Sequence, residues 1–474
     1  MTARGRRLPL AGASLIAAAI ALGVLSATQP VIALAAVGGA VIAYVIFSDL
    51  ATGFGILMFV SFLTVLPASG SLTPAKGAGF LLALAWVARY TTLNTDVRDF
   101  AGDHPLLSWL MIGLLGWAAA SVIWAPSTGA ALGELSQYFL TLILVPIAYT
   151  AVRSRRDLQI ALIAVVLGAM FAGAVGIVQP PNAEVLESTR ATGTIGDPNE
   201  FAADLIAGLA LATGFALSRG ARPSLRLLGL AAIPVCILGI FVSVSRGGLV
   251  ALTAVFVVAA FTAGRWRLAA VAMLLVAAIG GVLYFTEFAP LPARERVLTT
   301  NGGTGRAELW QVGLRIVRAH PVGGVGVGNY VRESPEFVLA PGVLHHSELI
   351  FTQEPKPAHN TYLQVTGEMG IPGLLLFLAV IIGCLRCALI AARIAAARGD
   401  VALEAQARGL FLATVGILAS VFFITQMHGK ILWGLLALAP ALLAVARREA
   451  SASPAAVEYA RTPALAVGPT PHAQ

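Results

Sequence analysis

Runs of about 20 consecutive apolar residues recur along almost the whole of this 474-residue chain. Each run is long enough to cross the hydrocarbon core of a bilayer as one α-helix. Only 11% of the residues are charged, whereas a soluble globular protein has about a quarter. The runs are continuous rather than alternating, which excludes a transmembrane β-barrel. The sequence therefore predicts an all-α polytopic membrane protein.

We expect about 12–14 transmembrane helices, with one large extracytoplasmic loop that contains short helices. The first apolar run follows Arg4, Arg6 and Arg7 and lacks a good cleavage site, so it is interpreted as a span rather than a signal peptide. The expected spans are 8–28, 31–48, 51–67, 76–92, 105–124, 132–152, 157–178, 200–218, 225–243, 247–264, 267–286, 371–395, 408–427 and 430–446.

The net charge of +8 does not indicate a nucleic-acid partner, because most of the arginines lie in short loops between apolar runs. With both termini in the cytoplasm, most of the basic residues fall on the cytoplasmic side, as the positive-inside rule requires. The chain then divides into N-terminal transmembrane helices (1–286), a large extracytoplasmic loop with an interfacial helix (287–370), C-terminal transmembrane helices (371–448) and a disordered cytoplasmic tail (449–474).

Two helices are expected in and just after the long loop. In residues 306–320, polar and apolar side chains alternate at steps of three and four, which predicts an amphipathic helix followed by a glycine-rich tight turn. In residues 359–369, Asn360, Gln364 and Glu368 recur every four residues and form a polar stripe. Gly370 and Pro372 then separate this short interfacial helix from the next span.

Ionisable side chains close to the apolar runs gather on the predicted outer face of the membrane. They are Glu134, Arg190, Asp197, Glu200, Asp204, Arg246, Arg306, His359 and Glu368. Ionisable residues near spans are costly and are usually functional. A cluster on one face favours chemistry at the outer leaflet over a path across the membrane.

The residue types in this cluster suit a diphosphate substrate. Arg190, Arg246 and Arg306 keep their charge and bind phosphate oxygens with two parallel hydrogen bonds. Fixed arginines also stabilise the negative charge that develops when a diphosphate leaves a glycosyl carbon. His359, whose unperturbed pKa is about 6.5, is the candidate to accept the proton of an acceptor hydroxyl. No metal and no other cofactor is expected.

Simpler interpretations remain open for single residues. Taken alone, Arg246 is consistent with an anchor to lipid phosphates, and His359 with a solvated loop residue. Asn199 is consistent with the residue that caps the start of the next helix. His345, His346 and Glu348 offer a weak metal site, since adjacent histidines rarely bind one ion. A transporter of lipid-linked glycans and a structural subunit of an envelope complex are the alternative protein classes.

Four segments of the chain together resemble the O-antigen ligase and polymerase superfamily of bacterial membrane proteins. They are RATGTIGDPNEFA (190–202), VSVSRGGLVAL (242–252), GRAELWQVGLRIVRAHPVGGVGVGNY (305–330) and AHNTYLQVTGEMGIPGLLLF (358–377). They occur in the order that the family has, and the combination is specific, whereas each segment alone is a weak signal.

The resemblance implies a membrane-embedded, GT-C-like glycosyltransferase. Such an enzyme moves a glycan from undecaprenyl diphosphate to an acceptor hydroxyl at the outer face of the cytoplasmic membrane, without a metal and with inversion. It implies that Arg246, Arg306 and His359 are catalytic. The implied partners are a polyprenyl-diphosphate-linked glycan donor, a glycan, lipid or protein acceptor, and membrane lipids, with no nucleic acid.

The remaining candidate residues are expected to bind the diphosphate or another part of the substrate; they are Arg190, Asn199, Asn360, Gln364 and Glu368. The sequence does not distinguish ligation of a finished glycan to a lipid A core from polymerisation of repeat units or O-glycosylation of a protein. The expectation is a ligase-like reaction, with the other two as alternatives.

Overall fold

Helices make up almost all of the described part of the chain, and no strand occurs in it. The computed structural model describes residues 28–65, 73–92, 99–179, 190–289, 291, 294, 306–339 and 355–451. Within these ranges, eight helices are long and apolar enough to cross a membrane, and four apolar helices are shorter. The predicted all-α polytopic membrane fold is confirmed.

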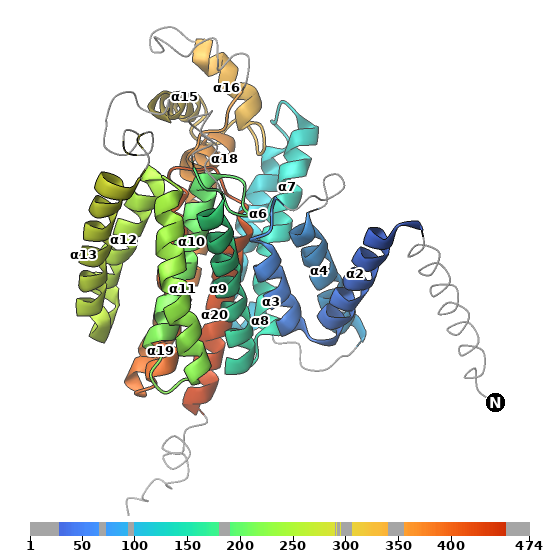
Figure 1. Cartoon of the computed structure of the whole chain (residues 1–474). Coiled ribbons are helices and arrows are strands. Elements are labelled where there is room, and N and C mark those ends of the chain that lie inside the picture. The colour runs from blue at the N-terminus through green and yellow to red at the C-terminus, as the bar shows by residue number, and fades with distance from the viewer. Residues whose placement is uncertain are drawn as a thin grey trace, which may run out of the picture.

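The helices follow one another along the chain, mostly antiparallel to their neighbours (Figure 1). The first half has α2 (Pro30–Ser48), α3 (Leu50–Val60), α4 (Pro74–Thr92), α5 (Phe100–Asp103), α6 (Pro105–Ser121), α7 (Thr128–Leu142), α8 (Leu144–Ala151), α9 (Arg155–Val178) and α10 (Pro198–Leu217). The second half has α11 (Pro223–Val242), α12 (Arg246–Thr262), η2 (Gly264–Trp266), α13 (Arg267–Leu283), the π-helical segment η3 (Tyr284–Phe288), α15 (Arg306–Ala319), α16 (Tyr330–Leu339), α18 (Thr361–Ala397), α19 (Val401–Ser420) and α20 (Lys430–Ser451).

Helix α10 lies at the centre of the bundle and is buried over most of its length. It packs most extensively against α19 and α11, and it also contacts α9 and α12. Its many alanines and glycines allow this close approach: a Cβ on Gly214 would lie 2.8 Å from the carbonyl oxygen of Ala405 in α19. Close backbone packing of small residues is typical of helices that associate within a membrane.

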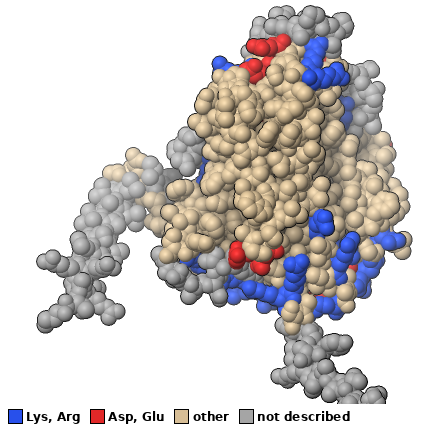
Figure 2. Space-filling view, turned by 180° about the vertical axis from the view of Figure 1, so that it is seen from behind, with Lys and Arg blue, Asp and Glu red and all other residues tan. Residues whose placement is uncertain are grey.

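The two ends of the bundle differ in charge and in structure. At the end that we call the basic end, Lys and Arg side chains form a band below a broad uncharged surface (Figure 2). Arg155 there pairs with Asp400 and, at 2.5 Å, with Glu449. At the opposite end, α15 and α16 lie across the tops of the other helices (Figure 1). We call this the loop end, and the candidate site lies there.

Twelve of the predicted spans lie close to a described helix or helix pair, but the span predicted at 408–427 is wrong by about two turns. The helix is α19, Val401–Ser420, which begins where Asp400 accepts a hydrogen bond from the backbone of Leu403. Glu404, only 2% exposed, is paired with Arg265 at 2.9 Å and Arg408 at 2.8 Å. Because its charge is neutralised, a segment that looks like a polar loop is buried as helix.

Some expectations lie outside the described residues. The first span (8–28) falls there except for its last residue, as do most of the tail (449–474) and the segment with His345, His346 and Glu348. Residues 290, 292–293, 295–305 and 340–354 of the long loop also lie outside the described residues. The division of the chain into its four predicted parts stays a prediction.

Candidate active site

Helix α18 changes direction at Gly370, as the sequence predicts. Gly370 has φ 67° and ψ −175°, a conformation that only glycine adopts readily. The segment from Thr361 to Met369 is therefore a short helix of its own, and the long apolar helix follows it. Ile371 donates a backbone hydrogen bond of 2.8 Å to Pro321, which ties the kink to the loop that follows α15.

The glycine-rich loop after α15 is the predicted tight turn. Gly324, Gly326 and Gly328 all have positive φ, between 64° and 92°. The loop packs so closely on the short helix that Val325 and Gly326 donate backbone hydrogen bonds of 2.8 and 2.9 Å to the carbonyls of residues 367 and 368. The positive φ angles and the close approach of two backbones explain these glycines.

The polar stripe of the short helix is buried rather than solvated. Glu368 is 1% exposed, and its side chain accepts hydrogen bonds from the backbone of Gly328 at 3.0 Å and from Gln364 at 3.2 Å. Gln364 in turn accepts one from the backbone of Ala358, and Asn360 caps the helix by accepting one from Leu363. These three side chains hold the residues on both sides of His359 in place.

His359 itself is half-buried and has an unusual backbone conformation. Its φ is 47°, and only one other non-glycine residue in the described ranges, Val244, has a positive φ. Such strained residues persist only where the surroundings enforce them, and they concentrate at functional sites. Burial lowers the pKa of His359 below its usual 6.5, and the positive charge of Arg306 lowers it further, whereas Asp197 opposes the shift. The imidazole is therefore neutral near pH 7.

Arg246 begins α12 two residues after Val244, the second strained residue. Val244 has φ 49°, and Ser245 caps the helix by accepting a hydrogen bond from Gly248 at 3.1 Å. The two glycines of the SRGG motif are required by packing, because a Cβ on Gly248 would lie 2.7 Å from the Cβ of Ala202 in α10. Arg246 is half-buried at this well-defined position at the loop end.

Arg190 and Asn199 stabilise the turn that precedes Arg246. Arg190, 6% exposed, donates to the carbonyl of Ser243 at 3.1 Å and to the side chain of Asn199 at 2.9 Å. The same Asn199 oxygen accepts a hydrogen bond from Ser245. The predicted capping role of Asn199 is wrong: Asp197 caps α10, since its carboxylate accepts from the backbone of residues 199 and 200. Asn199 therefore does not cap the helix, and its side chain links Arg190 to the SRGG turn.

The turn Val421–Gly429, between α19 and α20, joins the separate parts of the site. Thr361, 0% exposed, makes backbone hydrogen bonds to Val421 and Ile424 and receives one on its hydroxyl from Gln426. The Cβ of Phe423 in this turn lies 3.0 Å from the position that a Cβ on Gly247 would take. The turn therefore contacts the start of α12 and the residues that follow His359.

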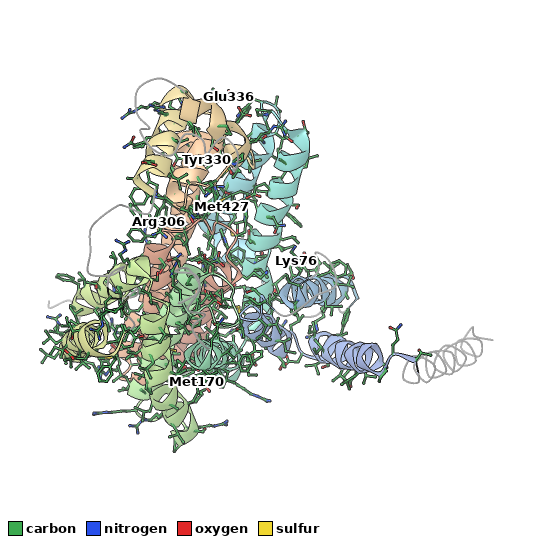
Figure 3. All side chains as sticks on the ribbon, turned by 45° about the horizontal axis from the view of Figure 1, so that its top comes forward. Lys76, Met170, Arg306, Tyr330, Glu336 and Met427 are labelled. Carbon is green, nitrogen blue, oxygen red and sulfur yellow. The ribbon has the colours of Figure 1, made fainter. Side chains whose placement is uncertain are left out.

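Helix α15, which begins at Arg306, contacts the same turn. That helix buries Leu309, Val312 and Ile316, the face predicted from the sequence. Its Trp310 ring lies 5.3 Å from Phe422 and 6.3 Å from Phe423. In Figure 3, Arg306 and Met427 lie where α15 and α16 meet the rest of the bundle. The structure thus brings the segments that carry Arg246, Arg306 and His359 into contact with one turn. Of the other candidates, Arg190 and Asn199 support the SRGG turn, whereas Asn360, Gln364 and Glu368 support the segment around His359.

Sequence reasoning singled out Glu134 but missed the polar residues His428 and Lys430 at the end of this turn. His428 bonds Glu134 of α7 at 2.7 Å, and its ring packs edge-on against Tyr138 at 4.4 Å. Glu134, His428 and Lys430 border a cavity described below. The polar run QMHGK (426–430) interrupts two apolar helices and is the signal that could have marked it.

Replacing Gly370 by alanine is expected to destabilise the protein by about 3 kcal/mol, because the position needs a glycine-only conformation. The new Cβ would also lie 2.0 Å from the carbonyl oxygen of Val322. Thermal unfolding in detergent measures the effect. Gly116→Ala in α6 is the matched control, since no atom lies within 4 Å of its Cβ position. Equal melting temperatures for the two variants would show that the kink is not enforced by Gly370.

A comparison with known protein families identifies the region that contains this site. The family model described as O-antigen ligase matches residues 230–378, from within α11 to the upper part of α18. The matched region includes Arg246, Arg306 and His359, but not Arg190, Asn199 or the turn Val421–Gly429. No curated protein matches the chain. Residues 230–378 are therefore similar to the O-antigen ligase family, which confirms the predicted resemblance to the O-antigen ligase and polymerase superfamily.

Proposed function

We propose that this protein transfers a glycan from a polyprenyl diphosphate, such as undecaprenyl diphosphate, to an acceptor hydroxyl. The observation that carries the proposal is the gathering of the segments that carry Arg246, Arg306 and a neutral His359 around the turn Val421–Gly429. Two fixed cations beside a neutral base suit a reaction in which a diphosphate leaves and a hydroxyl loses its proton. The family match supports a glycosyltransferase of the ligase or polymerase type.

In the proposed reaction, the acceptor oxygen attacks the anomeric carbon of the donor sugar from the face opposite the diphosphate. The bond from this carbon to the diphosphate oxygen breaks, and its electron pair stays on that oxygen. Arg246 and Arg306 stabilise the negative charge of the leaving group without a metal. His359 takes the acceptor proton. A single displacement of this kind inverts the anomeric configuration.

An apolar cavity next to Arg246 suits the lipid chain of such a donor. It has a volume of about 340 Å³ and lies between α11, α12, α13 and η3. Its lining includes Phe241, Leu249, Phe256, Leu274 and Phe285, and Leu249 lies one turn after Arg246 on α12. A prenyl chain in this cavity would place its diphosphate at the start of α12, where Arg246 and the helix N-terminus favour negative charge.

The charge distribution supports an extracytoplasmic site. The band of Lys and Arg at the basic end suits the cytoplasmic side of the inner, cytoplasmic membrane. The loop end, with α15, α16 and His359, then faces the periplasm or cell exterior. Lipid-linked glycans presented on the outer leaflet would reach the site from the membrane.

The proposed function is tested with purified protein in liposomes that contain an undecaprenyl-diphosphate-linked glycan and a defined lipid A core acceptor. We expect glycan transfer in the presence of EDTA. A single product band on a gel would indicate a ligase, whereas a ladder would indicate a polymerase. If glycan appears inside the liposomes with no covalent product, the protein is a transporter and the proposal is wrong.

The acid limb of the pH–rate profile is expected to lie below pH 6.5, because only the neutral imidazole of His359 accepts a proton. Its pKa is lowered by burial and by Arg306, so kcat/KM falls as the pH drops through this lowered pKa and is level at neutral pH. Initial rates of transfer between pH 5 and pH 8 measure the limb.

Two substitutions should move this limb in opposite directions. Lys356→Gln removes a positive charge that lowers the pKa of His359, so the limb moves to higher pH. Asp197→Asn removes a negative charge that raises it, so the limb moves to lower pH, and asparagine preserves the helix cap. Identical limbs in both variants would mean that another group accepts the proton.

A further inference from the structure

A second cavity lies at the loop end, and the proposed reaction does not use it. Its volume is about 360 Å³, and it is enclosed by the end of α3, by α7 and α10, and by the turn that leads into α20. Five ionisable side chains border it: Glu134, Glu200, Asp204, His428 and Lys430. Ser61, Thr64, Thr425 and Gln426 add hydroxyl and amide groups.

Several polar atoms around this cavity lack a partner within the described protein. Asp204 is 7% exposed, and its carboxyl group has no hydrogen bond with any described residue; only the charge of Lys430 acts on it favourably. The hydroxyl of Thr425 and the Nδ1 atom of His428 are buried and also lack a described partner. Burying a carboxylate without hydrogen bonds is costly, so natural proteins retain such a group mainly where something binds it.

The cavity is linked to the segment around His359 through the turn Val421–Gly429 and through α10. Gln426, which lines the cavity, donates its backbone hydrogen bond to Thr361 at 2.9 Å. Asp197, which acts on His359 electrostatically, also caps the helix that carries Glu200 and Asp204. In Figure 1, α7 lies on one side of α10, whereas α12 and α13 lie on the other. His359 is thus influenced both by Arg306 and by Asp197, the residue that caps the helix lining the cavity.

The charges of the cavity indicate what it can bind. Three carboxyl groups face one lysine and one histidine, and Glu134 is already paired with His428 at 2.7 Å. Glu200, Asp204 and Lys430 remain, so a phosphate or carboxylate ligand finds two carboxyl groups and a single cation. Carboxylates are strong acceptors for hydroxyl and ammonium hydrogens, and the hydroxyl and amide groups supply donors as well. The volume lies in the range of small-ligand pockets.

We propose that this cavity binds the sugar ring of the acceptor through its hydroxyl groups, and that it selects neutral or amino sugars over phosphorylated or acidic ones. The assignment to the acceptor rests on the proposed function, because His359 takes the proton from the acceptor and the arginines hold the donor. Asp204 hydrogen-bonds the ring in the buried part of the cavity, and Lys430 donates to it near the rim.

The test is ligand-observed NMR on the purified full-length protein with three probes of one ring shape. These are methyl β-glucoside, methyl β-glucosaminide and methyl β-glucuronide, which are neutral, cationic and anionic. We expect the first two to bind and the glucuronide to bind at least about tenfold more weakly. Asp204→Asn should weaken glucoside binding by about tenfold to a hundredfold, since it replaces a carboxyl oxygen that hydrogen-bonds the ring by an amide nitrogen.

Glu336→Gln is the matched control, because Glu336 is exposed on α16 and far from the cavity (Figure 3). Binding of geranylgeranyl diphosphate reports the diphosphate site separately and shows that each variant is folded. Should Asp204→Asn fail to fold, Glu200→Gln replaces it with the same expected loss. Equal binding of all three glycosides, or unchanged glucoside binding in a folded variant, would overturn the proposal.

The same experiment separates this inference from the proposed function. If geranylgeranyl diphosphate binds but no glycoside does, the cavity inference fails and the proposed function stands. If glycosides bind but no prenyl diphosphate does, the donor assignment fails. If an undecaprenyl-diphosphate-linked sugar displaces the glucoside and the sugar-free prenyl diphosphate does not, the cavity holds the donor sugar, and the acceptor assignment is wrong.

Discussion

His359→Ala is expected to lower kcat by about 10²–10⁴-fold, the usual contribution of a positioned general base. The neutral imidazole is held at a strained backbone position, with φ 47°, between the buried Ala358 and the cap residue Asn360. Because the base acts on the acceptor in the transition state, the loss should appear in kcat more than in the KM of the donor. Initial rates with purified protein and saturating donor measure it.

His320→Ala provides the control for this substitution. His320 follows α15 at the same end of the molecule, is exposed, and packs its ring edge-on against Phe337. We expect near-normal turnover from this variant. Near-normal turnover from His359→Ala would instead remove His359 from the role of base, whatever the control does.

Arg246→Gln is expected to lower kcat by about 10²–10³-fold. This is the usual effect of losing one preorganised group that stabilises a developing negative charge. Its position on the first turn of α12 is determined by the Ser245 cap and by the close packing of Gly247 and Gly248. Arg246→Lys should recover only part of the rate, because an ammonium group lacks the planar fork that binds two phosphate oxygens at once.

Arg332→Gln is the corresponding control, since Arg332 is exposed on α16. The leaving-group role of Arg246 has a second, independent signature. Geranylgeranyl diphosphate should bind Arg246→Gln more weakly than the wild type, while methyl β-glucoside should bind both equally. If Arg246→Gln had normal kcat and normal prenyl diphosphate binding, an anchor to membrane phosphates would be the better explanation of this residue.

The sequence predicted the parts of the fold that depend on local patterns. Apolar runs marked the helices, the alternation in residues 306–320 marked α15, and Gly370 marked the kink, because each signal lies within one segment. The boundaries of α19 were missed, since Glu404 becomes buried only when Arg265, far away in sequence, reaches it. A hydropathy profile of the sequence contains no information on such a pairing.

The candidate site divides in the same way. The sequence motifs contain Arg246, Arg306 and His359. The turn Val421–Gly429, which contacts all three segments, lies in a segment predicted as part of a span. The supporting roles of Arg190 and Asn199 depend on hydrogen bonds across some 45–55 residues of sequence, to Ser243 and Ser245. Long-range contacts of this kind leave no local pattern, so only the three-dimensional structure reveals them.

The most direct test of the central claim is the amount of undecaprenyl diphosphate released per glycan transferred by the purified protein in EDTA. The account predicts one molecule of undecaprenyl diphosphate for each new glycosidic bond made by the wild type, and almost none of either product from Arg246→Gln or His359→Ala. Transfer that requires an added divalent cation, or equal release by the wild type and both variants, would contradict it.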